Sequence, residues 1–144
     1  MIISRSALLP YSALQIYDVV ADIEAYPDFL NWCQNANIIR ESEDGVVAKL
    51  GIRYAKLKFD FTTRNVNISA KSIKLNLVDG PFSSFEGEWL FIELEEKACK
   101  VSLNMQFDFK RSLTKRIMEK MFGSIIDMQL DAFMRRAEQL YGHK

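Results

Sequence analysis

The sequence is short of the residues on which most enzyme chemistry depends. Its 144 residues include one histidine, His143, next to the end of the chain, and two cysteines, Cys33 and Cys99, in unrelated contexts. A Ser-His or Cys-His catalytic pair and a histidine-based metal site are therefore not expected. The cysteine spacing fits neither a metal site nor a redox motif, so reduced, buried thiols are expected.

Long apolar runs and glycine-rich loops are also missing. No uninterrupted apolar run approaches the roughly 20 residues that cross a bilayer, and no charged-then-apolar leader opens the chain. No glycine-rich phosphate loop follows an expected strand. With 49% hydrophobic residues, three prolines and six glycines, residues 1–144 are expected to fold as one cytoplasmic domain without extensive disorder.

Net charge is zero, yet the charges are segregated along the chain. Residues 18–44 and 79–99 are mostly acidic, whereas residues 46–78 and 110–120 are mostly basic. One interpretation is a set of solvated faces that complement one another in the fold. The other is a basic surface for ribosomal RNA or anionic lipid, and composition does not choose between them. Besides the basic cluster at 110–120, the candidate contact residues are Lys49, Arg53, Lys56, Lys58 and Lys74.

Hydrophobic periodicity predicts a strand, a helix and then a run of strands. A strand is expected over residues 2–9, and Ser12 and Gln15 have capping-box spacing. That helix should end before Pro27, with a further helical turn at 28–32. Consecutive strands joined by short turns form an antiparallel sheet with one apolar face, which predicts an α+β fold. These strands are expected at 37–43, 46–54, 56–69, 73–77, 85–94 and 99–110, with turns at 43–45 and 79–81.

The longest expected element is a helix from Ser112 to about Tyr141. Ser112 offers an N-cap, and apolar residues then recur at steps of three and four on one broad face. At 1.5 Å per residue the helix would be about 40 Å long, enough to cross a small domain. Gly123 and Ser124 lie near its middle, and such pairs are sites of bending. We therefore expect a bend there, with space for a ligand beneath it.

Several separated motifs carry a resemblance that covers nearly the whole chain. They are SRSALLPYS at 4–12, YPDFL at 26–30 with Cys33, TTRN at 62–65, NLVDGPF at 76–82, GEW at 87–89 and FDF at 107–109. In this order they resemble the coenzyme Q-binding branch of the START-like, or polyketide cyclase-like, superfamily. Within that branch the sequence is similar to the bacterial RatA proteins, named for ribosome association and toxin activity. Asn31 departs from the pattern, because relatives usually have a proline there, and this changes a turn near the expected pocket mouth.

The resemblance implies a helix-grip fold, in which a curved antiparallel sheet of about six to seven strands wraps around the long C-terminal helix. The function it implies is noncatalytic binding of ubiquinone or a related prenylated lipid in support of respiration. No cofactor would be required, and the protein would work in the cytoplasm or at the cytoplasmic face of the inner membrane. The alternative is a RatA-type toxin that binds the large ribosomal subunit and blocks subunit association. DNA is not an expected partner.

The resemblance also implies which side chains line a lipophilic tunnel, although each is equally compatible with an ordinary core. They are Phe59, Phe61, Leu75, Leu77, Trp89, Leu103, Met105 and Phe107 from the sheet, Phe29 at the mouth, and Met118, Phe122 and Ile125 from the helix. Tyr54 and Arg64 are the head-group candidates. Carboxylates that could run cyclase-type acid–base chemistry alternate with the apolar side and should face solvent. These carboxylates are Asp60, Glu86, Glu88 and Asp108.

Overall fold

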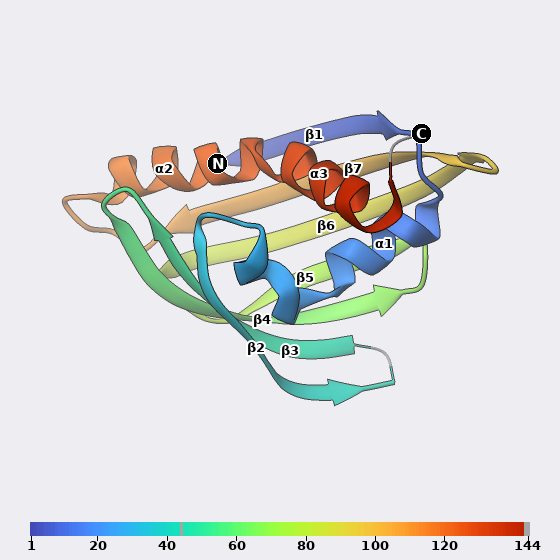
Figure 1. The fold of residues 1–144 in the computed structure, drawn as a ribbon. Coiled ribbons are helices and arrows are strands. Elements are labelled where there is room, and N and C mark those ends of the chain that lie inside the picture. Colours follow the sequence, from blue (N-terminus) through green and yellow to red (C-terminus); the bar gives the residue numbers. More distant parts are fainter. Residues whose placement is uncertain (44, 143–144) are drawn as a thin grey trace.

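The computed structural model describes residues 1–43 and 45–142 (Figure 1). His143 and Asp44, the middle residue of the turn expected at 43–45, lie outside the described residues. The strands are β1 (Ile2–Leu9), β2 (Cys33–Ser42), β3 (Gly45–Tyr54), β4 (Leu57–Ile68), β5 (Ser72–Asp79), β6 (Phe82–Glu95) and β7 (Ala98–Phe109). The helices are α1 (Ala13–Ala21), the 3-10 helix η1 (Ile23–Asp28), α2 (Lys115–Asp127) and α3 (Gln129–Tyr141).

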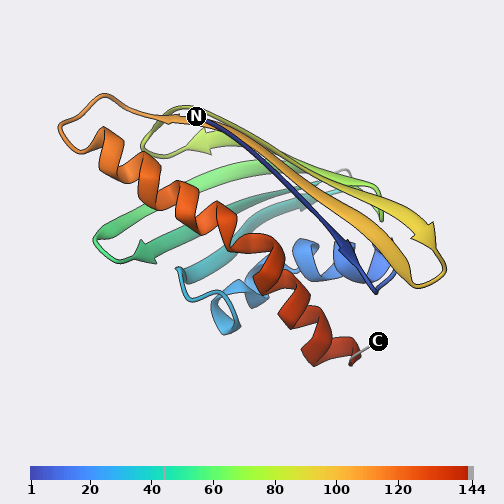
Figure 2. The same ribbon diagram turned by 90° about the horizontal axis from the view of Figure 1, so that it is seen from above.

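The strands form one antiparallel sheet in the order β1-β7-β6-β5-β4-β3-β2. The sheet is strongly curved, and α2 and α3 lie across its concave face with α1 and η1 beside them (Figures 1 and 2). In β4 the side chains of Leu57 and Phe61 are buried while Lys58 and Asp60 are exposed, so alternation turns the apolar face toward the helices. The expected α+β helix-grip architecture is confirmed.

Helix α1 begins with the expected capping box. The Ser12 hydroxyl accepts from the Gln15 amide at 3.1 Å, and the Gln15 side chain accepts from the Ser12 amide at 3.0 Å. The helix ends before Pro27, as expected, because Asp22 has φ −82° and ψ 70°, outside the helical region. The next turn is the 3-10 helix η1, which contains Pro27, so the helical turn expected at 28–32 lies instead at residues 23–28.

The C-terminal helix differs from the expectation at its start and at its bend. It begins at Lys115 after Thr114, without a side-chain cap from Ser112, and it divides at Met128, five residues after Gly123. The Met128 amide donates to the Ile125 and Ile126 carbonyls, a tightened turn that ends α2 and starts α3. Residues 123 and 124 stay helical, since Gly123 is buried against Ile3 of β1 rather than over open space.

Two groups of aromatic side chains lie in the interior, one under each half of the C-terminal helix. Under α2, the Phe122 ring centroid lies 4.9 Å from that of Phe107 and 5.3 Å from that of Phe82. Under α3, the Phe133 centroid lies 5.3 Å from that of Trp89 and 5.5 Å from that of Tyr26. We call the first group the Phe122 cluster: Phe59, Phe61, Phe82, Phe85, Phe107, Phe109 and Phe122. The second is the Phe133 cluster: Tyr26, Phe29, Trp89 and Phe133.

Candidate functional site

A cavity of about 90 Å³ lies between the Phe122 and Phe133 clusters. The first cluster contributes Phe61, Phe85 and Phe122 to its wall, and the second contributes Tyr26, Trp89 and Phe133. An engineered apolar cavity of roughly 150 Å³ is enough to bind benzene. A prenylated ring therefore enters this cavity only if its walls move apart. The remaining lining residues are Val20, Ala21, Ile23, Trp32, Ala48, Leu50, Ile52, Thr63, Asn65, Asn67, Ile73, Leu75, Leu103, Met105, Ile125, Ile126 and Gln129.

The structure brings some of the residues expected at the tunnel together and leaves others elsewhere. The expected residues that line the cavity are Phe61, Leu75, Trp89, Leu103, Met105, Phe122 and Ile125. Those outside the lining are Phe29, Phe59, Leu77, Phe107 and Met118. Phe59 and Phe107 pack within the Phe122 cluster, whereas Phe29 packs on Phe133 and is covered by the Arg136 guanidinium 5.0 Å from its ring.

Neither expected head-group residue reaches the cavity. Arg64 is exposed, because it alternates with the inward residues Thr63 and Asn65 of β4. Tyr54 is half-buried at the end of β3 and is not part of the lining. The cavity therefore takes its polarity from other side chains.

Amide and hydroxyl side chains supply that polarity, and sequence reasoning missed them. Thr63, Asn65 and Asn67 continue the inward face of β4 beyond Phe61, and Gln129 enters from the first residue of α3. Thr63 donates to the Asn65 side-chain oxygen at 2.7 Å. The signal for the β4 residues was present in the period-two alternation, which carries polar residues onto an otherwise apolar face.

Among the described lining residues, only Tyr26 has an acidic or basic side chain. Its hydroxyl donates to the Val20 carbonyl, and burial raises the pKa of Tyr26 far above its ordinary value, so it stays neutral. Burial likewise raises the pKa of Cys33 to about 11 and that of Cys99 to about 11. Both thiols are free, buried and protonated at neutral pH, so neither is an activated nucleophile.

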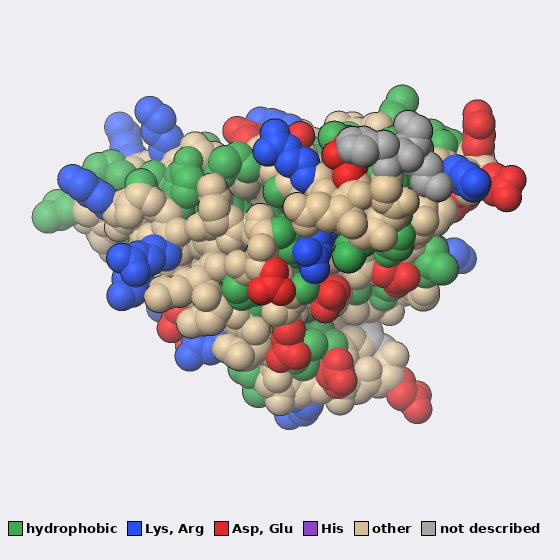
Figure 3. Space-filling view, in the orientation of Figure 1, with side chains coloured by type: hydrophobic (Ala, Val, Ile, Leu, Met, Phe, Trp, Pro, Cys, Tyr) green, Lys and Arg blue, Asp and Glu red, His purple; other side chains and the backbone are tan. Residues whose placement is uncertain are grey.

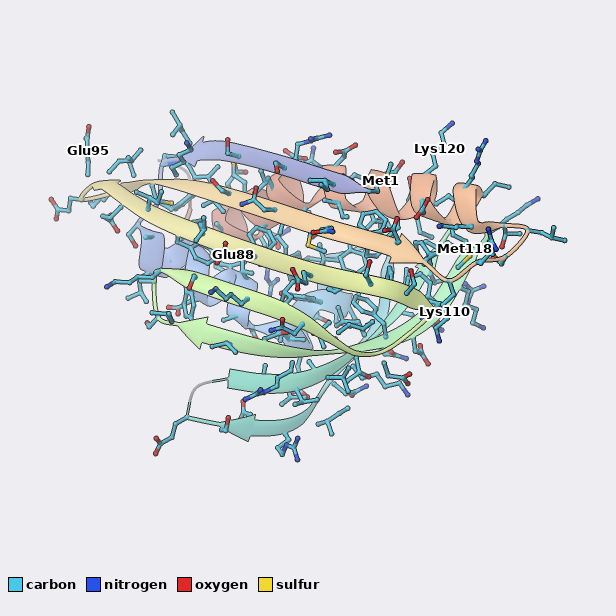
Figure 4. All side chains as sticks on the ribbon, turned by 180° about the vertical axis from the view of Figure 1, so that it is seen from behind. Met1, Glu88, Glu95, Lys110, Met118 and Lys120 are labelled. Atoms are coloured by element: carbon cyan, nitrogen blue, oxygen red, sulfur yellow. The ribbon has the colours of Figure 1, made fainter. Side chains whose placement is uncertain are left out.

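The carboxylates considered for acid–base chemistry do not line the cavity. Asp60 and Glu86 are exposed, and Glu88 lies on the outer face of the sheet (Figure 4). Asp108 is paired with the N-terminal ammonium at 3.2 Å, and that hydrogen bond lowers its pKa. Within residues 1–43 and 45–142, no cluster of three or more His, Cys, Asp or Glu could hold a metal ion. None of the described helices is long and apolar enough to cross a membrane.

Gly87 shapes the cavity from the sheet side. It pairs with Met105 on β7 and with Leu75 on β5, and both neighbours line the cavity. A methyl group at residue 87 would lie 2.5 Å from the Met105 sulfur and 3.1 Å from the Leu75 methyl Cδ1. Gly87 thus leaves the room that the Met105 side chain occupies.

A second candidate site is a basic surface at one end of the molecule. The β3–β4 turn and the start of α2 lie at the same end of the molecule in both ribbon views (Figures 1 and 2). Lys and Arg are the main charged side chains at that end in the space-filling view (Figure 3). Lys110 and Lys120 lie there, whereas Glu95 lies at the opposite end (Figure 4). We call this surface the basic end: Arg53, Lys56, Lys58, Lys110, Arg111, Lys115, Arg116 and Lys120.

The other two expected contact residues lie away from the basic end. Lys49 is 3.9 Å from Asp60, and Lys74 lies opposite Glu88 on the outer face of the sheet. Their charges are therefore balanced locally. At the basic end, in contrast, no described carboxylate forms an ion pair with Lys56, Lys58 or Arg116.

The basic end also breaks a rule of helix electrostatics. Lys115 and Arg116 occupy the first turn of α2, which contains no acidic residue. Because the N-terminus of a helix carries partial positive charge, cations there are unfavourable and anions are favourable. Leu113 in the same connection is fully exposed. Such local conflicts occur where a surface serves binding rather than stability.

Comparison with known proteins gives consistent matches. The family described as polyketide cyclase/dehydrase and lipid transport matches residues 9–134. The ribosome association toxin RatA of Pseudomonas aeruginosa is 44% identical over 140 residues, covering 97% of each chain. The mitochondrial coenzyme Q-binding protein COQ10 of Dictyostelium discoideum is 26% identical over 138 residues, covering 93% of this chain and 67% of the relative.

Solved structures match the fold at lower sequence identity. The Zhui aromatase/cyclase of Streptomyces sp. R1128 superposes with a TM-score of 0.87 at 17% identity, covering 96% of this chain and 94% of that chain. At such identity the likeness concerns the fold alone. One helix-grip architecture is thus shared by this chain and by a cyclase.

Proposed function

The chain belongs to the polyketide cyclase/dehydrase and lipid transport family, and we propose that it is a ribosome association toxin. In this proposal it binds the large ribosomal subunit and thereby blocks the joining of the two subunits. The basic end is the observation that carries the proposal. Two segments more than 50 residues apart in sequence meet there, and no described carboxylate forms an ion pair with Lys56, Lys58 or Arg116. The similarity to RatA proteins supports the same partner.

Ribosomal RNA presents the charge that such a surface needs. A phosphate group near the first turn of α2 would compensate both the helix dipole and the adjacent Lys115 and Arg116 side chains. Each cation that contacts a phosphate releases counterions, so affinity should fall steeply as salt increases. The exposed Leu113 would lie within this contact.

Sedimentation with purified large ribosomal subunits over a salt series tests this function. Changing Arg53, Lys56 and Lys58 to Gln should weaken binding at least tenfold and make the salt dependence shallower by about two to three units of log–log slope. The matched control changes Lys71, Lys97 and Lys100 to Gln, which removes the same charge from elsewhere and should leave binding unchanged. Equal losses in both variants, or binding to anionic vesicles without binding to subunits, would contradict the proposal.

We propose a second function for the cavity, the noncatalytic binding of a hydrophobic small molecule such as a prenylated ring compound. The supporting observation is the cavity itself, which is apolar on most of its wall yet carries buried amides that do not pack as an ordinary core. The similarity to COQ10 is in keeping with a lipophilic ligand. Binding a ligand in the interior and a ribosomal subunit at the surface are compatible in one protein.

The protein contains its own reporter for this binding. Trp32 and Trp89, its two tryptophans, both line the cavity, so a ligand there should change their fluorescence. Titration with a short-chain prenylated quinone is expected to quench that emission saturably. Organic extraction of the purified protein should also yield a lipophile. If extraction yields none and the added quinone leaves the emission unchanged, the second function is wrong.

A further inference from the structure

We infer that Asn67 and Gln129 form a polar subsite in the cavity that binds the hydroxyl group of a ring-shaped ligand, a phenol or a hydroquinone. The inference rests on the second proposed function, ligand binding in the cavity, and it specifies the chemistry of the head group. It assigns recognition of the head group to Asn67 of β4 and to Gln129 at the start of α3, neither of which the sequence motifs singled out.

The two amides share an unusual property. The side-chain oxygens of Asn67 and Gln129 are both buried without a hydrogen-bond partner, and both residues line the cavity. Gln129 is only 7% exposed. A buried carbonyl oxygen without a partner lowers stability, and such groups are few in native proteins. Their occurrence on the wall of one cavity points to a ligand that carries a hydrogen-bond donor.

Neighbouring polar groups in the same cavity do not share this property. The Thr63 hydroxyl donates to the Asn65 side-chain oxygen at 2.7 Å, so these two residues satisfy each other. The polar stripe of β4 is thus closed at Thr63 and Asn65. Asn67 hydrogen-bonds the Tyr17 hydroxyl through its side chain, and only its side-chain oxygen is left without a partner. On the helix side, the break at Met128 makes Gln129 the first residue of α3, with a buried side chain on the cavity wall.

The unpaired atoms determine the ligand chemistry. An amide oxygen accepts hydrogen bonds, so its partner must carry an O–H or N–H donor. A quinone carbonyl only accepts and would leave both oxygens unpaired. A phenolic hydroxyl donates and accepts, so it can pair with the oxygen of one amide while its own oxygen accepts from an NH₂ group. A neutral hydroxyl on an apolar ring matches the wall, whose one acidic side chain, that of Tyr26, is neutral.

A matched pair of probes tests the subsite. Binding of 4-pentylphenol and of 4-pentylanisole, which differ by the methylation of one hydroxyl, would be followed by tryptophan fluorescence. The full-length wild-type protein should bind the phenol about tenfold more tightly than the anisole, as one buried hydrogen bond predicts. Equal affinities for the two probes would overturn the subsite while leaving the cavity function intact.

Variants identify the residues responsible. Gln129→Met and Asn67→Leu should each reduce the preference for the phenol severalfold while anisole binding stays within about twofold of the wild type. Gln139→Met, on the exposed part of the same helix, is the control and should keep the full preference. A full preference in both cavity variants would overturn the assignment. Failure of the wild type to bind either probe would overturn the cavity function itself, and the subsite with it.

Discussion

The two halves of the interior differ in how closely their side chains pack. Beneath α2, the Phe122 cluster packs ring against ring, with the centroids of Phe82 and Phe109 4.5 Å apart. Toward α3, the wall between the clusters retains a cavity and carries buried amide oxygens without partners. Close packing stabilises a fold, whereas a cavity and unpaired polar atoms destabilise it. The contrast indicates that the first region stabilises the grip of the sheet on the helix, and it supports the ligand binding proposed for the second.

The largest expected effect comes from removing the centre of the closely packed half. Phe122→Ala should lower the free energy of unfolding by about 3–5 kcal/mol, because it leaves a void among rings that cannot collapse into it. Urea denaturation measures this loss. Phe29→Ala is the comparison, since Phe29 is only partly buried and should cost less. A loss below about 1 kcal/mol for Phe122→Ala would mean that the two halves do not differ in this way.

A change of the opposite sign is expected in the cavity half. Gln129→Met keeps the length of the side chain and removes an unpaired buried oxygen, so it should raise the free energy of unfolding by about 1–2 kcal/mol. Thermal and urea unfolding of the ligand-free protein measure the gain. A clear destabilisation would show that Gln129 contributes to packing and that the cavity half resembles the Phe122 half.

Two glycines offer a matched test at a smaller scale. Gly123→Ala should stabilise α2 by about 1 kcal/mol, since a methyl group there lies 3.4 Å from Ile3 Cδ1 in ordinary contact, and ligand binding should not change. Gly87→Ala should cost about 1 kcal/mol and weaken ligand binding severalfold, because it displaces the Met105 side chain toward the cavity. Equal effects of both changes on ligand affinity would remove the distinction between the two regions.

A further expected effect is a dependence on high pH. Burial raises the pKa of Cys33 to about 11 from an ordinary value of 9.0, so the unfolded chain loses this proton first as pH rises. The contribution of the neutral thiol is therefore intact below pH 9 and is lost between pH 9 and 11. Cys33→Ala should make the free energy of unfolding decline less steeply with pH, as measured by urea denaturation at pH 8 to 11. The Phe122 cluster has no ionisable side chain, so Phe122→Ala should leave the slope unchanged.

Local patterns predicted most of the fold because their causes are local. The capping box of Ser12 and Gln15 and the alternation of Leu57 and Phe61 with Lys58 and Asp60 act over a few residues, and the structure confirms them. The bend of the C-terminal helix was predicted, but in the wrong place. Gly123 permits a bend, yet its contact with β1 keeps it helical, and the division occurs at Met128 instead.

The residues that make up the cavity wall could not be predicted from local patterns, because they are brought together by tertiary structure. Phe107 alternates on the same face of β7 as Leu103, but Phe107 pairs with Phe85 of β6 and lies in the Phe122 cluster, whereas Leu103 pairs with Trp89 and lies on the cavity wall. Alternation assigns a side chain to one face of the sheet. Only the curvature of the sheet and the path of α2 and α3 decide which part of that face is closely packed and which part borders the cavity.

By itself, then, the sequence determined an antiparallel sheet with one apolar face, a capped first helix and a long amphipathic second one, because hydrophobic period and capping chemistry are properties of neighbouring residues. Tertiary structure alone decided that Asn67 and Gln129, from a strand and a distant helix terminus, share one cavity. It also decided that the β3–β4 turn and the start of α2 form one basic end. Both assemblies join segments far apart in sequence, and only the chain's path through the curved sheet brings such segments together.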